Sequence, residues 1–182
     1  MTFKELQADI YNADYTASVN QRYHQAKQSQ WHFWDCVNRF ATFGLTIAGV
    51  VAAIPAVQFD SVWGLFLAIL SAVSAGVLAV IPVSENAIHH GTLFQSWTDL
   101  RSDIEELAIE AKKLQKGDSS ESAGNALPER LQVLTAKRSR IEAQEPKLDD
   151  AKLVECQELE NLSRYNARTY DEVMKKLSAA AA

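Results

Sequence analysis

The chain has 182 residues with 18 basic and 23 acidic side chains, which gives a formal net charge of −5 at neutral pH. This length fits one domain, or one domain with an extension. Because the balance is acidic and no basic cluster is present, the sequence argues against nucleic-acid binding and against a broad surface for anionic lipids. The mean hydropathy of −0.16 averages an apolar middle with two polar flanks.

Residues 1–39 predict an N-terminal cytoplasmic helix followed by a segment at the membrane surface. Thr2 and Glu5 have the spacing of a capping box, in which each side chain accepts a hydrogen bond from a free backbone N–H of the first turn. Apolar residues then recur at helical spacing, and the helix is expected to reach about residue 34. Thr, Ser and Asn are frequent between residues 14 and 20, which leaves room for a break there.

The middle of the chain is almost free of charge. Asp60 is the only charged residue between Arg39 and Glu85. About 20 apolar residues in a helix span a hydrocarbon core of about 30 Å. The sequence therefore predicts a transmembrane hairpin over residues 40–84, with spans at about 40–59 and 62–83 and a kink at Pro55.

Aromatic and basic residues mark the ends of the predicted spans. Trp31, Trp34 and Arg39 precede the first span, and Trp63 follows the polar tip, so these four are the expected membrane-interface anchors. The tip carries no Lys or Arg. The positive-inside bias therefore places both termini in the cytoplasm.

Small residues recur along both spans and allow helices to pack closely in lipid. They either hold the two helices of one hairpin together or also contact neighbouring protomers. Ser71, Ser74 and Gly76 are the expected pore-lining residues, although serine can also return a hydrogen bond to its own helix. No ionisable residue lies within a span, which argues against a proton relay.

The region 85–116 predicts a long cytoplasmic helix with a heptad stripe. Its apolar residues alternate in steps of four and three, which is typical of a coiled coil or tight bundle. The expected oligomer interface within this stripe consists of Leu93, Trp97, Leu100, Ile104, Leu107 and Leu114.

The remaining chain predicts a linker over 117–128 and C-terminal helices over 129–182. Pro128 fits the first turn of a helix, and Pro146 ends or kinks that helix. A last helix from about residue 148 to 177 has as its expected buried residues Leu153, Cys156, Leu159, Leu162, Tyr170, Val173 and Leu177. Whether these helices pack within one chain or between protomers stays open. With no strand pattern, the fold class is an all-α membrane protein.

The sequence contains no motif for catalysis. No phosphate loop, dinucleotide fingerprint, nucleophile elbow or zinc-protease motif is found, so no enzyme activity and no cofactor are expected. Cys36 and Cys156 are expected to be free thiols. Glu85 with His89 or His90 has the spacing of a metal site, but polar residues at a helix exit explain the same pattern.

Several of these features resemble the SLATT domain: Arg22-Tyr23-His24 in an N-terminal helix, two close spans, the entry from His90 to Leu93, and Trp97-Thr-Asp-Leu-Arg101. The similarity covers about residues 10 to 115. The resemblance implies a two-span membrane effector of bacterial conflict systems that disrupts the membrane. It also implies a nucleotide second messenger or a sensor protein as trigger. The chain lacks a separate nucleotide-sensing fold, so a partner or residues 118–178 would have to supply that step.

The sequence thus predicts an oligomeric effector of the bacterial inner membrane that forms or gates a pore in anti-phage defence. The expected partners are the lipid bilayer and further copies of the chain. Two alternatives remain. One is a non-conducting membrane anchor that recruits a cytoplasmic partner through its coiled coil. The other is a phage lysis or exclusion protein, which is disfavoured by the long structured tail.

Overall fold

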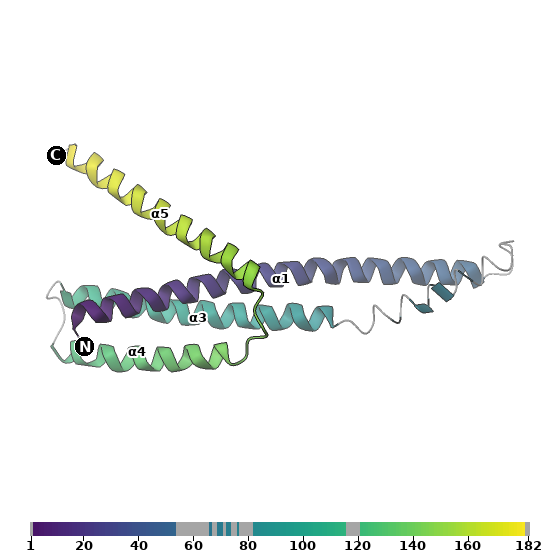
Figure 1. Cartoon of the computed structure of the whole chain (residues 1–182), viewed down its shortest axis with the longest axis horizontal. Helices are drawn as coiled ribbons and strands as arrows, with labels where there is room; N and C mark the ends of the chain where they lie inside the picture. Colours follow the sequence, from purple (N-terminus) through teal and green to yellow (C-terminus); the bar gives the residue numbers. More distant parts are fainter. Residues whose placement is uncertain are drawn as a thin grey trace. The chain divides into compact units, whose positions relative to one another are not determined.

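The computed structural model describes residues 2–53, 66, 69, 70, 72, 73, 76, 82–115 and 121–180. Side chains are described for all of these except 48–53, 121–125 and 173–180. Over this part of the chain the structure is helical and contains no strand, which confirms the all-α prediction (Figure 1). The helices with defined bounds are α1 (Phe3–Ala53), α3 (Val83–Gln115), α4 (Glu121–Glu142) and α5 (Asp150–Ala180).

The chain divides into two compact units. Unit 1, the bundle, comprises Met1–Gln25 and Gly91–Ala182, and unit 2, the hairpin unit, comprises Ala26–His90. Helix α1 and helix α3 each contribute one part to the bundle and another part to the hairpin unit. The two units are described separately below.

The start of α1 forms the predicted capping box. The backbone N–H of Thr2 donates to Glu5 Oε2 at 2.6 Å, and the backbone N–H of Glu5 donates to Thr2 Oγ1 at 3.3 Å. Each side chain satisfies a donor that the first helical turn leaves free. The hydrogen bonds lower the pKa of the Glu5 carboxyl, with the backbone bond at Thr2 contributing most.

The possible break between residues 14 and 20 does not occur, because α1 continues through this stretch. Two of its polar side chains are bonded in ways that support the helix. Thr16 donates its hydroxyl to the carbonyl of Asn12 at 3.0 Å, and Ser18 is buried with its hydroxyl 3.5 Å from Arg164 of α5. The polar residues therefore bond within the helix or to the bundle instead of ending the helix.

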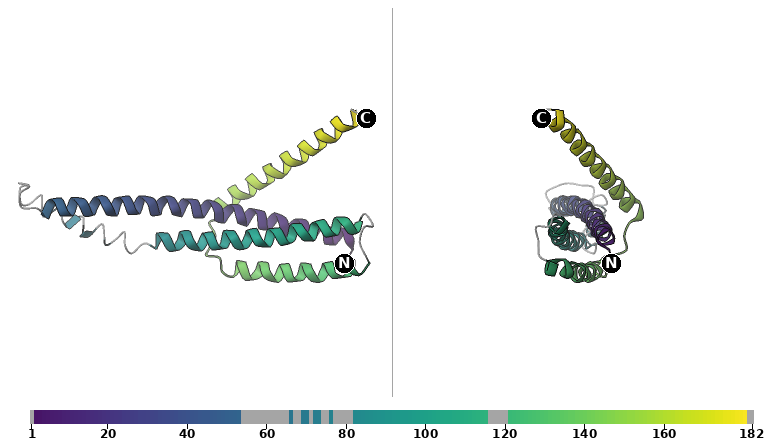
Figure 2. Two further views of the ribbon diagram at one scale, coloured as in Figure 1. Left: turned by 180° about the vertical axis from the view of Figure 1, so that it is seen from behind. Right: turned by 90° about the vertical axis from the view of Figure 1, so that its left-hand side faces the viewer.

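The core of the bundle is built on the heptad stripe of α3. Its residues pack against the first part of α1 and against α4, which lies alongside them (Figures 1 and 2). The buried residues from α1 are Leu6, Ile10 and Ala17, and those from α4 are Leu127, Leu131 and Ile141. Within unit 1, α4 thus folds back on the α3 of its own chain.

Helix α4 begins at Glu121, earlier than expected, so Pro128 lies inside the helix and not in its first turn. Leu127, which lies in the predicted linker, is buried in the core. Burial of such a side chain contributes about 1.5–3 kcal/mol, which favours helix around it despite the proline. The undescribed residues between α3 and α4 are 116–120.

A short connection after Glu142 contains Pro146 and leads into α5, as the sequence predicts. Asp149 caps α5, because its carboxylate accepts a hydrogen bond from the backbone N–H of Lys152 at 3.3 Å. The backbone N–H of Asp149 donates in turn to the hydroxyl of Tyr23 at 2.9 Å. This bond ties the start of α5 to α1.

Only one face of α5 packs against the other helices of the bundle. Cys156 is buried and Leu153 is partly buried beside Val19 and Tyr23. Leu159, Leu162 and Tyr170 are exposed, so the prediction that they are buried is wrong within this chain. Val173 and Leu177 lie outside the residues whose side chains are described.

In the hairpin unit, the first turns of α3 bury Val83, Ala87 and His90. The part of α1 in this unit instead exposes large apolar side chains, and the same holds for several described residues of the second predicted span. The exposed ones are Phe33, Trp34, Val37, Phe40, Phe43, Ile47, Phe66, Ile69, Leu70 and Val73.

Among the described residues, no helix combines the length and apolar character needed to cross a bilayer. The first predicted span lies in α1 up to Ala53, and its remainder, including Pro55, falls outside the described residues. In the second predicted span, the described residues that precede Pro82 are all helical. These are residues 66, 69, 70, 72, 73 and 76.

Candidate functional site: a polar junction in the bundle

The residues predicted as an oligomer interface lie in the interior of the bundle. Leu93, Trp97, Leu100, Ile104 and Leu107 are at most 1 % exposed, and Leu114 packs at the edge of the same cluster. Their partners are α1 and α4 of the same chain. In this conformation the stripe is fully covered, so its use between protomers remains a prediction that requires the bundle to open.

Polar side chains gather where α1, α3, α5 and the α4–α5 connection meet. We call these side chains together the polar junction; they form one network of His24, Trp97 and Glu145 and a second network of Asp14, Arg22, Arg101, Glu160 and Arg164. The partners in these contacts come from different helices and are distant in sequence. The junction therefore joins helices that are not neighbours along the chain.

The carboxylate of Glu145 holds the inner half of the junction. Glu145 Oε1 lies 2.9 Å from His24 Nε2 and accepts a hydrogen bond from Trp97 Nε1 at 2.7 Å. The side chains of His24 and Glu145 are 0 % and 7 % exposed. Because buried hydrogen-bonding groups are costly to leave unpaired, Glu145 fixes the α4–α5 connection against α1 and α3.

The outer half of the junction holds α5. Glu160 accepts hydrogen bonds from Arg22 and Arg164, each at 2.7 Å, and Arg164 also donates to Asp14 at 2.6 Å. The Arg164 guanidinium lies over the rings of Tyr11 and Tyr15, at 4.9 and 5.3 Å from their centroids. Arg164 is therefore bound to α1 through both charge and aromatic contact.

Arg101 extends the junction to the polar side of α3. Its Nε lies 3.5 Å from Asp14 Oδ1, a charge contact without a hydrogen bond, and 3.1 Å from Glu105 Oε1. It also donates to the side-chain oxygen of Gln21 at 3.2 Å. Asp14 thus lies between two arginines from different helices.

Burial and charge act in opposite directions on the groups of the junction. Burial alone would raise the pKa of Glu160, but the hydrogen bonds from Arg22 and Arg164 outweigh it, so the pKa lies below its ordinary value. Burial would lower the pKa of Arg164, whereas Glu160 and Asp14 raise it further above its ordinary value. Both groups are therefore charged across the physiological range.

The geometry of the junction fits a structural contact between helices better than a catalytic site. Glu145 and Glu160 contact side chains from two residues each, and Asp14 accepts a hydrogen bond from Arg164 through Oδ2. Burial raises the pKa of the nearby Cys156 thiol, which disfavours the nucleophilic thiolate. The arrangement can hold helices together and release them if its charges or partners change.

Part of the junction was visible in the sequence. Arg22, His24, Trp97 and Arg101 belong to the stretches that resemble the SLATT domain, but no partner was assigned to them. Glu145, Glu160, Arg164 and Asp14 were missed. The spacing of Glu160 and Arg164 fits an ion pair within one helix, which is the one local signal that could have pointed to them.

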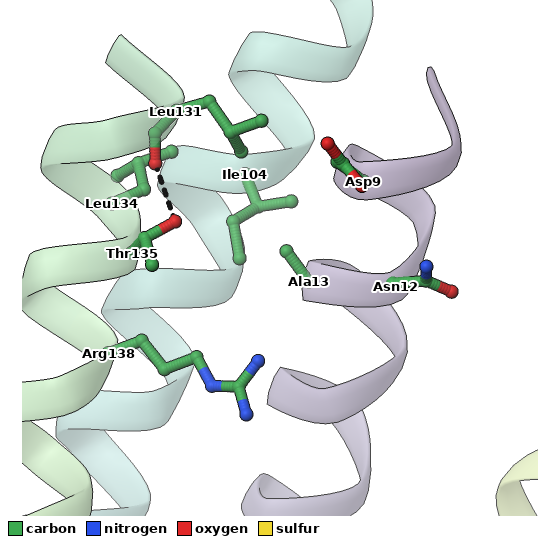
Figure 3. Close-up of a pocket in the computed structure, with 8 residues that line it drawn as sticks. All are labelled: Asp9, Asn12, Ala13, Ile104, Leu131, Leu134, Thr135 and Arg138. Carbon is green, nitrogen blue, oxygen red and sulfur yellow. Dashed lines mark hydrogen bonds between the residues drawn. The ribbon is translucent and has the colours of Figure 1, made fainter. Parts of the chain in front are cut away.

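A cavity of about 230 Å³ lies between α1, α3 and α4 (Figure 3). Ile104, Leu131, Leu134 and Ala13 supply its apolar wall. Thr135 lies beside them and donates its hydroxyl to the carbonyl of Leu131 at 2.9 Å, which satisfies it within its own helix. The other lining side chains are Asp9, Asn12 and Arg138, and Arg138 is paired with Glu142 of its own helix at 2.7 Å.

The predicted membrane anchors fall in the hairpin unit. Trp34 is 50 % exposed, Trp31 is partly buried, and Arg39 is exposed and paired with Asp35 at 2.9 Å. Gly76 is helical and exposed, and a Cβ there would meet no atom within 4 Å. Trp63, Ser71 and Ser74 lie outside the described residues.

The residues of the possible metal site at the start of α3 are divided between the surface and the interior. Glu85 and His89 are exposed, and His90 is buried. Within the described part of the chain, no group of three His, Cys, Asp or Glu residues is placed to hold a metal ion.

Comparisons with protein families, with curated proteins and with solved structures find no match to this chain.

Proposed function

We propose that this chain is an oligomeric membrane effector whose hairpin, residues 40–84, inserts into a bilayer and forms or gates a pore. The proposal places it in the bacterial inner membrane with both termini in the cytoplasm, and it assigns the protein no catalysis. The activity would serve anti-phage defence, on the strength of the resemblance to the SLATT domain. The trigger would be a nucleotide second messenger or a sensor protein.

The observation that carries the proposal is the apolar surface of the hairpin unit. Phe40 is 74 % exposed, Phe43 is 66 % exposed, and Ile47 follows on the same helix. No charged residue other than Asp60 occurs between Arg39 and Glu85 to make this surface soluble. Contiguous apolar surfaces of this kind mark contact with lipid or another protein.

The bundle supplies a resting state in this proposal. The heptad stripe is covered by α1 and α4, and the polar junction holds α5 and the α4–α5 connection in place. A trigger that binds the bundle in an opened state better than in the closed state would shift the equilibrium toward opening. The exposed stripe would then be free to join protomers.

The alternative function is a non-conducting anchor that recruits a partner. One observation favours it: α5 carries an exposed apolar face with Leu159, Leu162 and Tyr170 in the closed bundle. A partner could bind this face without any rearrangement. The anchor needs the same membrane insertion but no conduction.

Recordings from the purified full chain in a planar bilayer distinguish the two functions. A pore gives discrete current steps, whereas an anchor gives none even when Leu131→Asp, which changes the α4 cover of the stripe and not the stripe itself, has opened the bundle. Ser71→Cys or Ser74→Cys in a Cys36→Ser background should make the current sensitive to a charged thiol reagent. Ser84→Cys, outside the predicted spans, is the matched control. Inserted protein that stays silent with both native and opened bundles would overturn the pore.

A further inference from the structure

The hairpin unit contains an apolar cleft between α1 and the start of α3. Its volume is about 400 Å³, within the usual range for small-molecule sites. The residues that line it are Gln30, Trp31, Trp34, Val37, Asn38, Ala41 and Val83. Two indole rings and three aliphatic side chains make the lining mainly apolar, with a side-chain amide from each of Gln30 and Asn38.

The cleft lies where the character of α1 changes. Its α1 residues run from Gln30 to Ala41, and the ion pair between Asp35 and Arg39, the last two charged residues of this helix, lies within the same turns at 2.9 Å. Phe40, Phe43 and Ile47 expose apolar side chains where the charge-free stretch begins. The cleft therefore spans the boundary between the charged and the charge-free parts of α1.

This position matches the headgroup zone of a bilayer. Tryptophan rings concentrate there, because they combine an apolar body with a polar N–H. An apolar cleft at this depth would face the glycerol backbone and first methylenes of a phospholipid, since the exposed residues beyond it would face the acyl chains. Because these methylenes are already in hydrocarbon, their seating in the cleft would depend on van der Waals packing against the indole rings.

We propose that this cleft binds the upper part of one acyl chain of a bilayer phospholipid. The proposal rests on membrane insertion of the hairpin, and it adds a defined lipid site to that insertion. The indoles of Trp31 and Trp34 contact the methylenes next to the glycerol, and the amides of Gln30 and Asn38 lie toward the ester groups. The occupied cleft would fix the depth of α1 in the bilayer.

Tryptophan quenching by brominated phospholipids tests this site. The full chain carrying Trp63→Phe is reconstituted into phosphatidylcholine vesicles brominated either near the headgroup or near the chain end. Trp31 and Trp34 then report on the cleft, and Trp97, buried in the bundle, supplies a constant background. Ala41→Leu adds bulk to the lining, whereas Cys36→Leu adds bulk at an exposed position outside the cleft.

The expected result is strong quenching by the shallow bromines and weak quenching by the deep ones. Ala41→Leu should at least halve the shallow quenching, and Cys36→Leu should leave it unchanged. Equal quenching in the two variants, with both floating with the vesicles and both helical by circular dichroism, would overturn the lipid site alone. Failure of the parent chain to float with vesicles would overturn the site together with the proposed membrane function.

Discussion

Large apolar side chains are buried in the core of the bundle, whereas many of them are exposed in the hairpin unit. In the bundle, Leu93, Trp97 and Leu100 are covered by helices of the same chain, and charged residues around them are paired. In the hairpin unit, Phe40, Phe43 and Ile47 point outward, with no charged neighbour in the sequence beyond Arg39 before Asp60. The presence of large apolar side chains therefore does not by itself distinguish the two regions. What distinguishes them is whether the chain supplies the second surface itself.

The two regions need different partners. The bundle supplies the second surface for its own stripe and pairs the charges around it, so this stripe needs no further cover. An outward apolar row requires a partner with the same polarity, either lipid or protein. This division can be tested through the stability of the bundle and the surface of the hairpin unit.

The largest effect is expected at Trp97, which is fully buried and donates to Glu145. Trp97→Ala should lower the free energy of unfolding by about 3–5 kcal/mol, because it leaves a cavity and removes the indole donor from the Glu145 carboxylate. Urea titration of the full chain in detergent, followed by circular dichroism, measures this change. Trp97→Phe keeps the bulk and should cost clearly less. A loss below about 1 kcal/mol for the alanine variant would contradict the buried core.

Arg164 comes next, because it joins α5 to α1 through Glu160 and Asp14. Arg164→Met should destabilise the docking of α5 by about 3 kcal/mol, since it leaves the buried Glu160 with fewer partners. Hydrogen exchange of the backbone amides in α5 should accelerate. The matched control is Arg168→Met, which removes an exposed arginine paired only with Glu172 of its own helix. Equal acceleration in both variants would show that Arg164 does not anchor α5.

Removal of the Glu145 carboxylate should have a smaller effect. Glu145→Ala leaves the ring nitrogen of His24 and the indole N–H of Trp97 without this acceptor and should cost about 2 kcal/mol. Glu145→Gln keeps an acceptor oxygen and should recover part of the loss. The urea midpoint of each variant gives the values. An alanine variant as stable as the parent would mean that the inner half of the junction contributes nothing to the fold.

The pH dependence of α5 follows from Glu160, whose folded-state pKa is lowered by the hydrogen bonds from Arg22 and Arg164. A carboxyl with a lower pKa in the folded state stabilises that state above its unfolded pKa, and this contribution is lost as pH falls through the folded value. Protection of α5 from exchange should therefore fall on acidification below the ordinary glutamate range. Glu160→Gln should flatten this dependence, and an unchanged acid response in that variant would assign it to other carboxylates.

The smallest effect on stability is expected in the hairpin unit. Phe40→Ser removes an exposed side chain and should change the unfolding free energy of the bundle by less than about 0.5 kcal/mol. The same change should weaken binding to phospholipid vesicles, as measured by flotation. A bundle destabilised by Phe40→Ser would contradict the division between the two regions.

Local patterns predicted much of the helical structure. The capping box at Thr2 and Glu5, the long helix through the heptad stripe, and the start of the last helix after Pro146 all depend on neighbours within a few residues. Such features are encoded by short-range spacing. Where prediction failed, at the possible break near Thr16 and at the start of α4, tertiary contacts outweighed local preference.

The polar junction could not be predicted in the same way. Glu145 is 48 residues from Trp97 in the sequence, and Arg164 is 150 residues from Asp14. Nothing in the spacing of these residues says that they meet. Their pairing depends on the turn that α4 makes against α3 and on the cap that ties α5 to Tyr23.

Periodicity and composition are local properties of the chain, and the helical fold class, the position of the apolar stripe and the nearly charge-free middle follow from them alone. The covering of the α3 stripe by α1 and α4 appears only in the packed bundle. The same holds for the exposed Leu159 and Leu162 of α5 and for the two polar networks that join residues distant in sequence. A stripe specifies only that a surface must be buried, whereas the choice of partner depends on how all the helices pack together.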